Sequence, residues 1–406
     1  MNYQSHTFKN GLRIVHKQIP NEVSYCGFFI NAGTRDELTG EFGMAHFVEH
    51  MLFKGTKKRR SFQIINRMET VGGELNAYTN KEETVIYSAF LEQHFERAFE
   101  LLSDLVFDST FPDNEIEKEI DVILDEIHSY EDSPSELILD EFENIVFKNS
   151  QIGHNILGEP AMLETFNSKS ANEFVKRTYI PDEIVFFSVG KTDFKKILRI
   201  VEKYIPDASF LSENRARIAP KHISGHTIRE NRNTNQAHVM IGGRGYSLHD
   251  TKRKNLSLLN NILGGPGMNS RLNVSLREKR GYVYNVESGV TAYTDTGLFS
   301  IYFGTDKQNI EKCVKLVFKE IERLKCKKLT TIQLAAAKKQ LRGQIAISRD
   351  NNENMALSLG KSFAHFNHID SMEETFRKIE SISPEDILGT ANEIFDESNI
   401  FQLIYS

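Results

Sequence analysis

An internal repeat relates the two halves of this sequence. The segment LNAYTNKEETVIYSAF, which begins at Leu75, matches VTAYTDTGLFSIYFGT, which begins at Val290, at an offset of 215 residues. The helix-like stretches that follow also align, so that Leu101 corresponds to Leu316. Agreement of strand, turn and helix at one offset favours a duplication over a chance match. A chain of 406 residues also exceeds one ordinary core, so the sequence predicts two similar domains.

Local patterns predict alternating strands and helices in the first half, where β-branched runs end at Gly or Asn and apolar residues recur at helical spacing. We expect, in order, strands at 11–18 and 24–33, helices at 42–53 and 61–71, a hairpin at 74–90, and helices at 91–107 and 113–130.

The polar stretch PDASFLSENRARIAPKHI separates the two halves of the repeat. Within it, residues 211–223 are predicted to form a linker. We therefore expect a first domain at 1–210 and a second, homologous domain at 224–406.

One short stretch breaks the apolar pattern around it. His46, Glu49 and His50 lie in the run FGMAHFVEHMLF. At the corresponding positions the second half has Asn261, Gly264 and Gly265. A requirement of the fold would appear in both halves, so the triplet indicates a function of the first half.

The spacing of the triplet is that of a metal site. His46 and His50 are four apart, so on a helix both imidazoles project from one face and can bind one metal ion. Glu49 lies about 60° round from His46, where it could reach a metal-bound water. This H-x-x-E-H arrangement is the reverse of the H-E-x-x-H zinc motif. The alternative is a buried helix with two hydrogen-bonded histidines.

The segment 113–130 offers a third ligand. With Ile116 at zero and about 100° per residue, Ile123 lies in an apolar stripe, and Glu119 and Glu126 lie at about 300° and 280° on its border. A carboxylate on a core-facing edge is costly unless it is paired or bound to metal. An ordinary amphipathic border is the alternative, which the two histidines make less favoured.

Three motifs, GMAHFVEHMLFKGT, GGELNAYTNKEETVIY and VILDEIHSYEDSP, together resemble the M16 (pitrilysin-type) metallopeptidases. The match is closest to the branch that contains the mitochondrial processing peptidase β-subunit and its bacterial relatives, and it covers nearly the whole chain. The resemblance implies an α+β duplication. In it, two tandem homologous domains, mainly antiparallel sheets flanked by helices, face each other across a cleft.

The resemblance also implies the roles of the residues in the first half. Zinc (Zn2+) would be bound by His46, His50 and Glu126, with Glu49 as general base and Glu119 as a supporting catalytic carboxylate. Two further residues, Asn76 and Ala77, lie on the strand that pairs with an extended substrate in relatives. Glu82 falls in the motif NAxTxxE, where a structural role is expected.

In the second half, GGPGMNSRLNVSLREKRGYVYNV resembles the glycine-rich segment of the family, which is followed by an Arg…Tyr pair. The seven-residue spacing selects Arg277 and Tyr284, which in relatives reach the substrate near the zinc, whereas Tyr282 has the wrong spacing. A basic surface helix followed by a turn is the alternative for this stretch alone.

These residues predict a zinc-dependent endopeptidase that acts on peptides or unfolded polypeptide in extended form. Glu49 would take a proton from a zinc-activated water, and Arg277 and Tyr284 would stabilise the oxyanion or hold the substrate. The rival hypothesis is a non-catalytic scaffold or regulatory subunit, but such relatives typically lose the ligands that this chain keeps.

Composition limits the partners and the compartment. A net charge of −6 and a pI near 6.1 argue against nucleic acid, and the basic run KGTKKRR at 54–60 is typical of a solvated face. Three cysteines without a CxxC pair suit a reducing compartment, and no apolar run is long enough to span a membrane. We expect a cytoplasmic protein and, by analogy with this branch, a homodimer.

Overall fold

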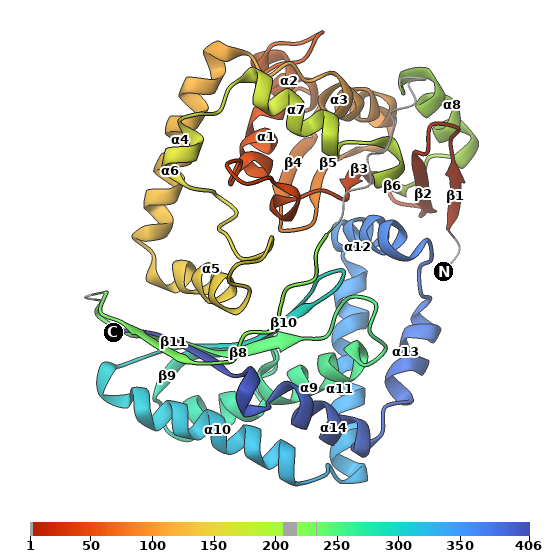
Figure 1. The fold of residues 1–406 in the computed structure, drawn as a ribbon. Coiled ribbons are helices and arrows are strands. Elements are labelled where there is room, and N and C mark those ends of the chain that lie inside the picture. The colour runs from red at the N-terminus through yellow and green to blue at the C-terminus, as the bar shows by residue number, and fades with distance from the viewer. Residues whose placement is uncertain (1–2, 206–216, 233) are drawn as a thin grey trace. The chain divides into compact units, whose positions relative to one another are not determined.

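The computed structural model describes residues 3–205, 217–232 and 234–406, which form two compact units. Unit 1 comprises Met1–Ile127, His154–Arg217 and Ile347–Ser371. Unit 2 comprises His128–Gly153, Ile218–Ala346 and Met372–Ser406. Figure 1 shows the strands and helices of both units and labels many of them.

The sheet of unit 1 has six strands in the order β1-β2-β6-β3-β5-β4. Their bounds are β1 Gln4–Thr7, β2 Arg13–Gln18, β3 Val23–Ile30, β4 Glu74–Thr79, β5 Thr84–Leu91 and β6 Ile184–Gly190. All neighbours are antiparallel except β2 and β6, which are parallel. The strand β4 therefore lies at one edge of the sheet.

Helices surround this sheet. They are α1 Met44–Leu52, α2 Ser61–Glu69, α3 Phe95–Asp108, α4 Asp113–Glu131, α6 Pro160–Leu163, α7 Ser168–Thr178, α8 Phe194–Tyr204 and α12 Asn352–Phe366. The last residues of α4 extend beyond Ile127 into unit 2.

Alternation along β3 places its side chains in two cores, one on each face of the sheet. The ring centroid of Phe28 lies 5.9 Å from that of Phe99 on α3. The next residue, Phe29, packs in a separate cluster with Leu359 and Phe363 of α12. The sheet of unit 1 is thus covered by α3 on one face and by α12 on the other.

The sheet of unit 2 repeats this arrangement in the order β7-β11-β8-β10-β9. The strands are β7 Thr227–Glu230, β8 Ala237–Gly245, β9 Val283–Ala292, β10 Gly297–Thr305 and β11 Phe401–Tyr405. Each follows its counterpart in unit 1 at an offset close to 215 residues, and the β7–β11 pair is parallel, like β2–β6. The predicted duplication is confirmed.

The helices of unit 2 include counterparts of α1 and α3, namely α9 and α10. The helices are α5 Pro134–Val146, α9 Arg253–Gly264, the π-helix η4 Asn273–Glu278, α10 Ile310–Cys326, α11 Thr331–Asp350, α13 Met372–Glu380 and α14 Pro384–Ile394. The last residues of α11 extend beyond Ala346 into unit 1. The strands, helices and hairpin expected in the first half agree with the structure to within a few residues.

The units differ from the contiguous domains expected at 1–210 and 224–406, because each contains one helix from the other half of the chain. In unit 2, α5 contributes Ile138 and Phe142 to a core with Leu403 of β11. In unit 1, a Cβ at Gly360 of α12 would lie 2.5 Å from the ring of Phe187, so glycine permits the close approach. Helical periodicity predicts an apolar face but not which sheet it covers.

Residues 211–216 of the expected linker at 211–223 lie outside the described residues, which resume at Arg217, and the linker stays a prediction. No helix in the described part of the chain is long and apolar enough to cross a membrane.

Candidate metal centre

The helix α1 is anchored at its N-terminus by a buried carboxylate. Gly43, at the N-cap position with a φ of 98°, and Ala45 donate their backbone N–H groups to Glu37 over 3.0 and 2.8 Å. Nε2 of His154 lies 2.9 Å from the same carboxylate, which has no exposed side-chain surface. Burial raises the pKa of Glu37 well above its ordinary value, although the two amides lower it. This network fixes the start of the helix that carries His46, Glu49 and His50.

The two histidines of α1 and Glu126 of α4 converge. Nε2 of His46 lies 3.8 Å and Nε2 of His50 lies 3.7 Å from Oε2 of Glu126. One ligand atom from each of the three residues lies within 4.8 Å of the other two. Ligand atoms around one tetrahedral zinc are about 3.3 Å apart. The three residues therefore lie close enough together to hold one zinc ion.

Glu119 lies about two turns before Glu126 on α4 and orients His50. Its Oε1 lies 2.9 Å from Nδ1 of His50, and its Oε2 lies 2.5 Å from Nζ of Lys54. A proton on Nδ1 satisfies this hydrogen bond and leaves the lone pair of Nε2 directed to Glu126. Burial alone would raise the pKa of Glu119, but the hydrogen bonds from His50 and Lys54 lower it below its ordinary value.

The two imidazoles differ in their electrostatics. Burial, with a contribution from the charge of His50, lowers the pKa of His46 to about 3. Burial would also lower the pKa of His50, but the hydrogen bond and charge of Glu119 and the nearby Glu49 raise it. Among the described residues, no hydrogen-bond partner faces the buried Nδ1 of His46. A buried, neutral imidazole suits a zinc ligand, because the lone pair must be available.

Glu49 projects from α1 beside these ligand atoms. Burial raises its pKa, which Thr79 and His50 lower and Glu126 raises further. A carboxylate with a raised pKa is a better proton acceptor near neutral pH. Glu49, His50 and Glu119 line one cavity of about 360 Å³ within unit 1.

The edge strand β4 forms another wall of this cavity, through Leu75, Asn76 and Ala77. Within the described part of the sheet, β4 pairs with β5 alone, so its outer backbone groups are available to an extended peptide. Phe53 and Ile65 add apolar surface to the same lining.

Glu82 lies in the turn between β4 and β5. Its Oε1 lies 2.6 Å from a guanidinium nitrogen of the fully buried Arg35. The pair holds the hairpin against the segment that leads to α1, in keeping with the expected structural role.

Arg277 and Tyr284 lie in unit 2, so their contribution to the metal centre stays a prediction. Within that unit they are neighbours: the guanidinium carbon of Arg277 is 6.0 Å from the centroid of the Tyr284 ring. Tyr284 is 86% exposed. Tyr282, by contrast, packs partly buried against the core of unit 2.

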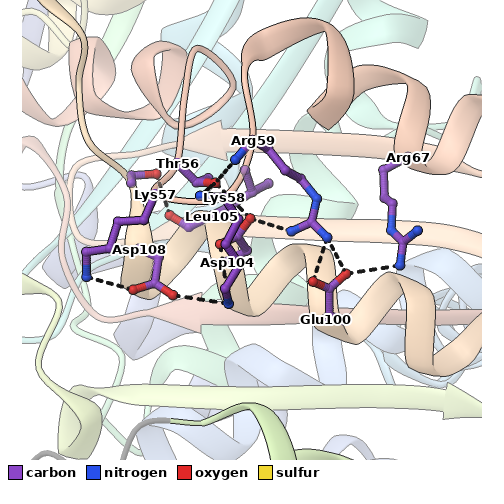
Figure 2. A network of polar contacts seen from close by, with 10 residues as sticks. Thr56, Lys57, Lys58, Arg59, Arg67, Glu100, Asp104, Leu105 and Asp108 are labelled. Atoms are coloured by element: carbon purple, nitrogen blue, oxygen red, sulfur yellow. Dashed lines mark hydrogen bonds and ion pairs between the residues drawn. The ribbon is translucent and has the colours of Figure 1, made fainter.

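The basic run that follows α1 has a role within unit 1. Figure 2 shows its side chains meeting three acidic residues of α3: Glu100, Asp104 and Asp108. Arg59 lies 2.5 Å from the fully buried Asp104 and 2.6 Å from Glu100. The run thus joins the end of α1 to the helix that covers the sheet.

Sequence reasoning missed Glu37 and His154, which are 117 residues apart. Neither belongs to a local sequence motif, and they meet at the start of α1 only through tertiary contacts.

Two tandem M16 domains account for this fold and this arrangement of side chains. Residues 13–160 match the family described as insulinase (peptidase family M16), and residues 165–341 match the family described as the peptidase M16 inactive domain. The second description agrees with the absence of the His/Glu triplet from the second half.

Curated relatives match along almost the full chain. An uncharacterized zinc protease of Rickettsia bellii is 34% identical over 98% of this chain and 96% of its own length. The zinc protease YmxG of Bacillus subtilis, also described as uncharacterized, is 30% identical over 98% of this chain and 97% of its own. The chain belongs to peptidase family M16.

Solved structures share the fold. A protease from Helicobacter pylori superposes with a TM-score of 0.92 at 20% identity, covering 100% of this chain and 99% of that one. A structure from Pseudomonas fluorescens, titled as a peptidase M16 inactive domain, superposes with a TM-score of 0.89 at 22% identity, covering 100% and 98%.

Proposed function

We propose that this protein is a zinc-dependent endopeptidase that cleaves peptides or unfolded precursor segments bound in extended form. The observation that carries the proposal is the convergence of His46, His50 and Glu126. Glu49 lies on the same helix as the two histidines and lines one cavity with His50. A zinc ion held there would polarise the scissile carbonyl and make a water molecule more acidic.

The chain's own residues supply the remaining steps. Glu49 accepts the proton of the attacking water and returns it to the leaving amine, a role that its raised pKa supports. Glu119 keeps His50 in one tautomer and orientation. The edge of β4 at Asn76 and Ala77 binds the peptide through main-chain hydrogen bonds, which places little demand on sequence.

In unit 2, we assign Arg277 and Tyr284 to substrate binding and oxyanion stabilisation. Their exposure and mutual proximity support this role, because both side chains are accessible to a ligand and can contact it together.

The lining of the cavity supports a substrate preference. Glu49, Glu69 and Glu119 line it, and Lys54, the one lysine or arginine among the described lining residues, is paired with Glu119. Glu119 belongs to the segment 113–143, which is rich in Asp and Glu. We expect peptides with Lys or Arg near the scissile bond to be preferred, and more so at low salt.

Kinship with the mitochondrial processing peptidase β-subunit branch and a homodimer are part of the proposal and rest on the resemblance. A cytoplasmic location is also part of it and rests on the cysteine usage and the lack of a long apolar run. A non-catalytic scaffold or regulatory subunit is the alternative, and the inactive-domain title of the Pseudomonas fluorescens structure is the observation in its favour. Against it, this chain keeps the expected zinc ligands His46, His50 and Glu126 and the expected base Glu49.

The test is mass spectrometry of the products formed from a mixed peptide library by zinc-loaded protein, with and without a chelator. The proposal predicts internal cleavages that the chelator abolishes and that zinc restores. A scaffold would leave the library intact under both conditions.

A further inference from the structure

Unit 2 contains a strongly basic cavity that plays no part in the metal centre. It has a volume of about 460 Å³ and lies between the segment 269–280, the helix α10 and the start of α11. Its charged lining consists of Arg271, Lys279, Arg280, Lys319, Arg323, Lys327 and Lys328, with the single carboxylate Glu320. Because the whole chain has a net charge of −6, this accumulation of positive charge is local.

Most of that charge is not neutralised within the protein. Arg323 is 2.5 Å from Glu320, and Lys328 is 2.8 Å from Glu385. For the other five cations, no carboxylate lies within 4.0 Å in the described part of the chain: Arg271, Lys279, Arg280, Lys319 and Lys327. Like charges held together in this way are unfavourable unless an anion joins them.

Two of these cations are held in place. A guanidinium nitrogen of Arg280 donates to the carbonyl oxygen of Ser275 over 2.7 Å, which fixes the side chain against η4. Arg271 is half-buried, and this burial lowers its pKa, with Glu320 opposing the shift and Arg323 adding to it. A partly desolvated guanidinium gains more from a bound anion than a fully hydrated one does.

We propose that this cavity binds a small multivalent anion of the oligophosphate type. The cations come from the segment 269–280, from α10 and from the residues directly after α10. A compact ligand with several negative oxygens could contact all three at once. Its volume is in the range of small-molecule sites. Among the described residues that line it there is no aromatic side chain and no strand, so it offers neither a surface for stacking bases nor an edge for a peptide.

The proposal is independent of peptidase activity, and its test is a binding measurement on the full-length, zinc-loaded protein. Isothermal titration with inorganic tripolyphosphate at low salt should show saturable binding to one site. The variant Lys319→Glu/Lys327→Glu should bind at least about 100-fold more weakly, because each lost charge-assisted contact costs about a factor of ten. Both lysines are exposed, and neither forms an ion pair with another described residue, so thermal unfolding of this variant should match the wild type.

The matched control is Lys221→Glu/Lys307→Glu, which makes the same charge change at exposed residues of unit 2 outside the cavity. This control should bind within about threefold of the wild type, since net charge acts weakly at a distance. Oligophosphates also chelate zinc, so the titration is repeated with His46→Ala, in which binding should persist.

Three results would overturn the proposal. One is absence of binding, and another is equal weakening in the two double variants. The third is tighter binding of a single-stranded oligonucleotide or a polyglutamate peptide than of tripolyphosphate at the same lysines, which would make the cavity part of a macromolecular surface.

Discussion

Nδ1 of His50 lies 2.9 Å from Oε1 of Glu119, a carboxylate 69 residues further along the chain. This contact joins α1 to α4 and directs the other ring nitrogen of His50 to Glu126. His50, the second histidine of the H-x-x-E-H motif, is therefore oriented before a metal ion binds. Such preorganisation reduces the cost of assembling a site.

The first prediction concerns this contact. Glu119→Gln removes the negative charge that favours a proton on Nδ1 of His50, so zinc affinity should fall by about 10- to 100-fold. A competition titration against a chelator of known affinity measures this. Glu117→Gln, at an exposed position of the same helix, should leave the affinity unchanged. Equal affinities in all three proteins would show that Glu119 does not support the ligand.

The second prediction concerns acid stability. Burial lowers the pKa of His16 and His154 to about 4 and that of His46 to about 3. These side chains stay neutral in the folded protein, while the unfolded chain takes up protons below about pH 6.5. The free energy of unfolding should therefore decrease as the pH falls from about 6.5 toward 4, by up to about 1.4 kcal/mol per pH unit for each histidine.

His50 affects the pH dependence of stability in the opposite direction, because its pKa is raised in the folded protein. Its contribution to stability is complete below about pH 6.5 and is lost as the pH rises through the raised pKa. Urea denaturation of chelator-treated protein between pH 7.5 and 4.5, roughly the range in which these groups titrate, measures the sum. His16→Gln should reduce the slope by the share of one histidine. A slope that does not change in this variant would contradict the assignment of a low pKa to His16.

The third prediction is that Tyr284 of unit 2 contributes to turnover and that the nearby Tyr282 does not. If the hydroxyl of Tyr284 donates to the oxyanion, Tyr284→Phe should lower turnover of a peptide by about 10²- to 10³-fold with zinc content unchanged. Tyr282→Phe is the control and should stay near wild type, because Tyr282 packs against the core. Arg277→Ala should weaken both binding and turnover. Wild-type turnover in Tyr284→Phe would remove unit 2 from the proposed chemistry.

The fourth prediction concerns the ion pairs after α1. Arg59→Ala leaves the fully buried Asp104 without its 2.5 Å partner, so the free energy of unfolding should fall by about 3 kcal/mol. Arg60→Ala, at the exposed neighbour, should change it by no more than about 0.5 kcal/mol. Chemical denaturation of the two variants gives the comparison. Similar losses in both would mean that the network in Figure 2 contributes little.

Periodicity and the repeat predicted much of this structure. The 215-residue offset predicts the second sheet, whose five strands correspond to β2–β6 of the first, because a duplicated segment keeps the pairing of its parent. The helical angles of Glu119 and Glu126 place both on the border of the apolar stripe of α4, the side that meets α1. Local spacing is sufficient there, because both residues sit on one regular helix.

Three features could not be predicted from local patterns. The exchange of α5 and α12 between the units depends on which apolar surfaces fit, a property of tertiary packing. The anchoring of α1 by Glu37 and His154 depends on a contact distant in sequence. The basic run after α1 resembled a solvated face, yet its partners lie on α3, more than 40 residues away.

The most direct test of the account is zinc content measured beside peptide hydrolysis in wild type, His46→Ala and Glu49→Gln. The account predicts about one zinc per chain and hydrolysis in the wild type, since one half of the duplication has a complete ligand set. His46→Ala should lose both zinc and activity. Glu49→Gln should keep the zinc and lose hydrolysis, because it removes the base but no ligand. Undiminished hydrolysis in Glu49→Gln, or full zinc content in His46→Ala, would contradict the account.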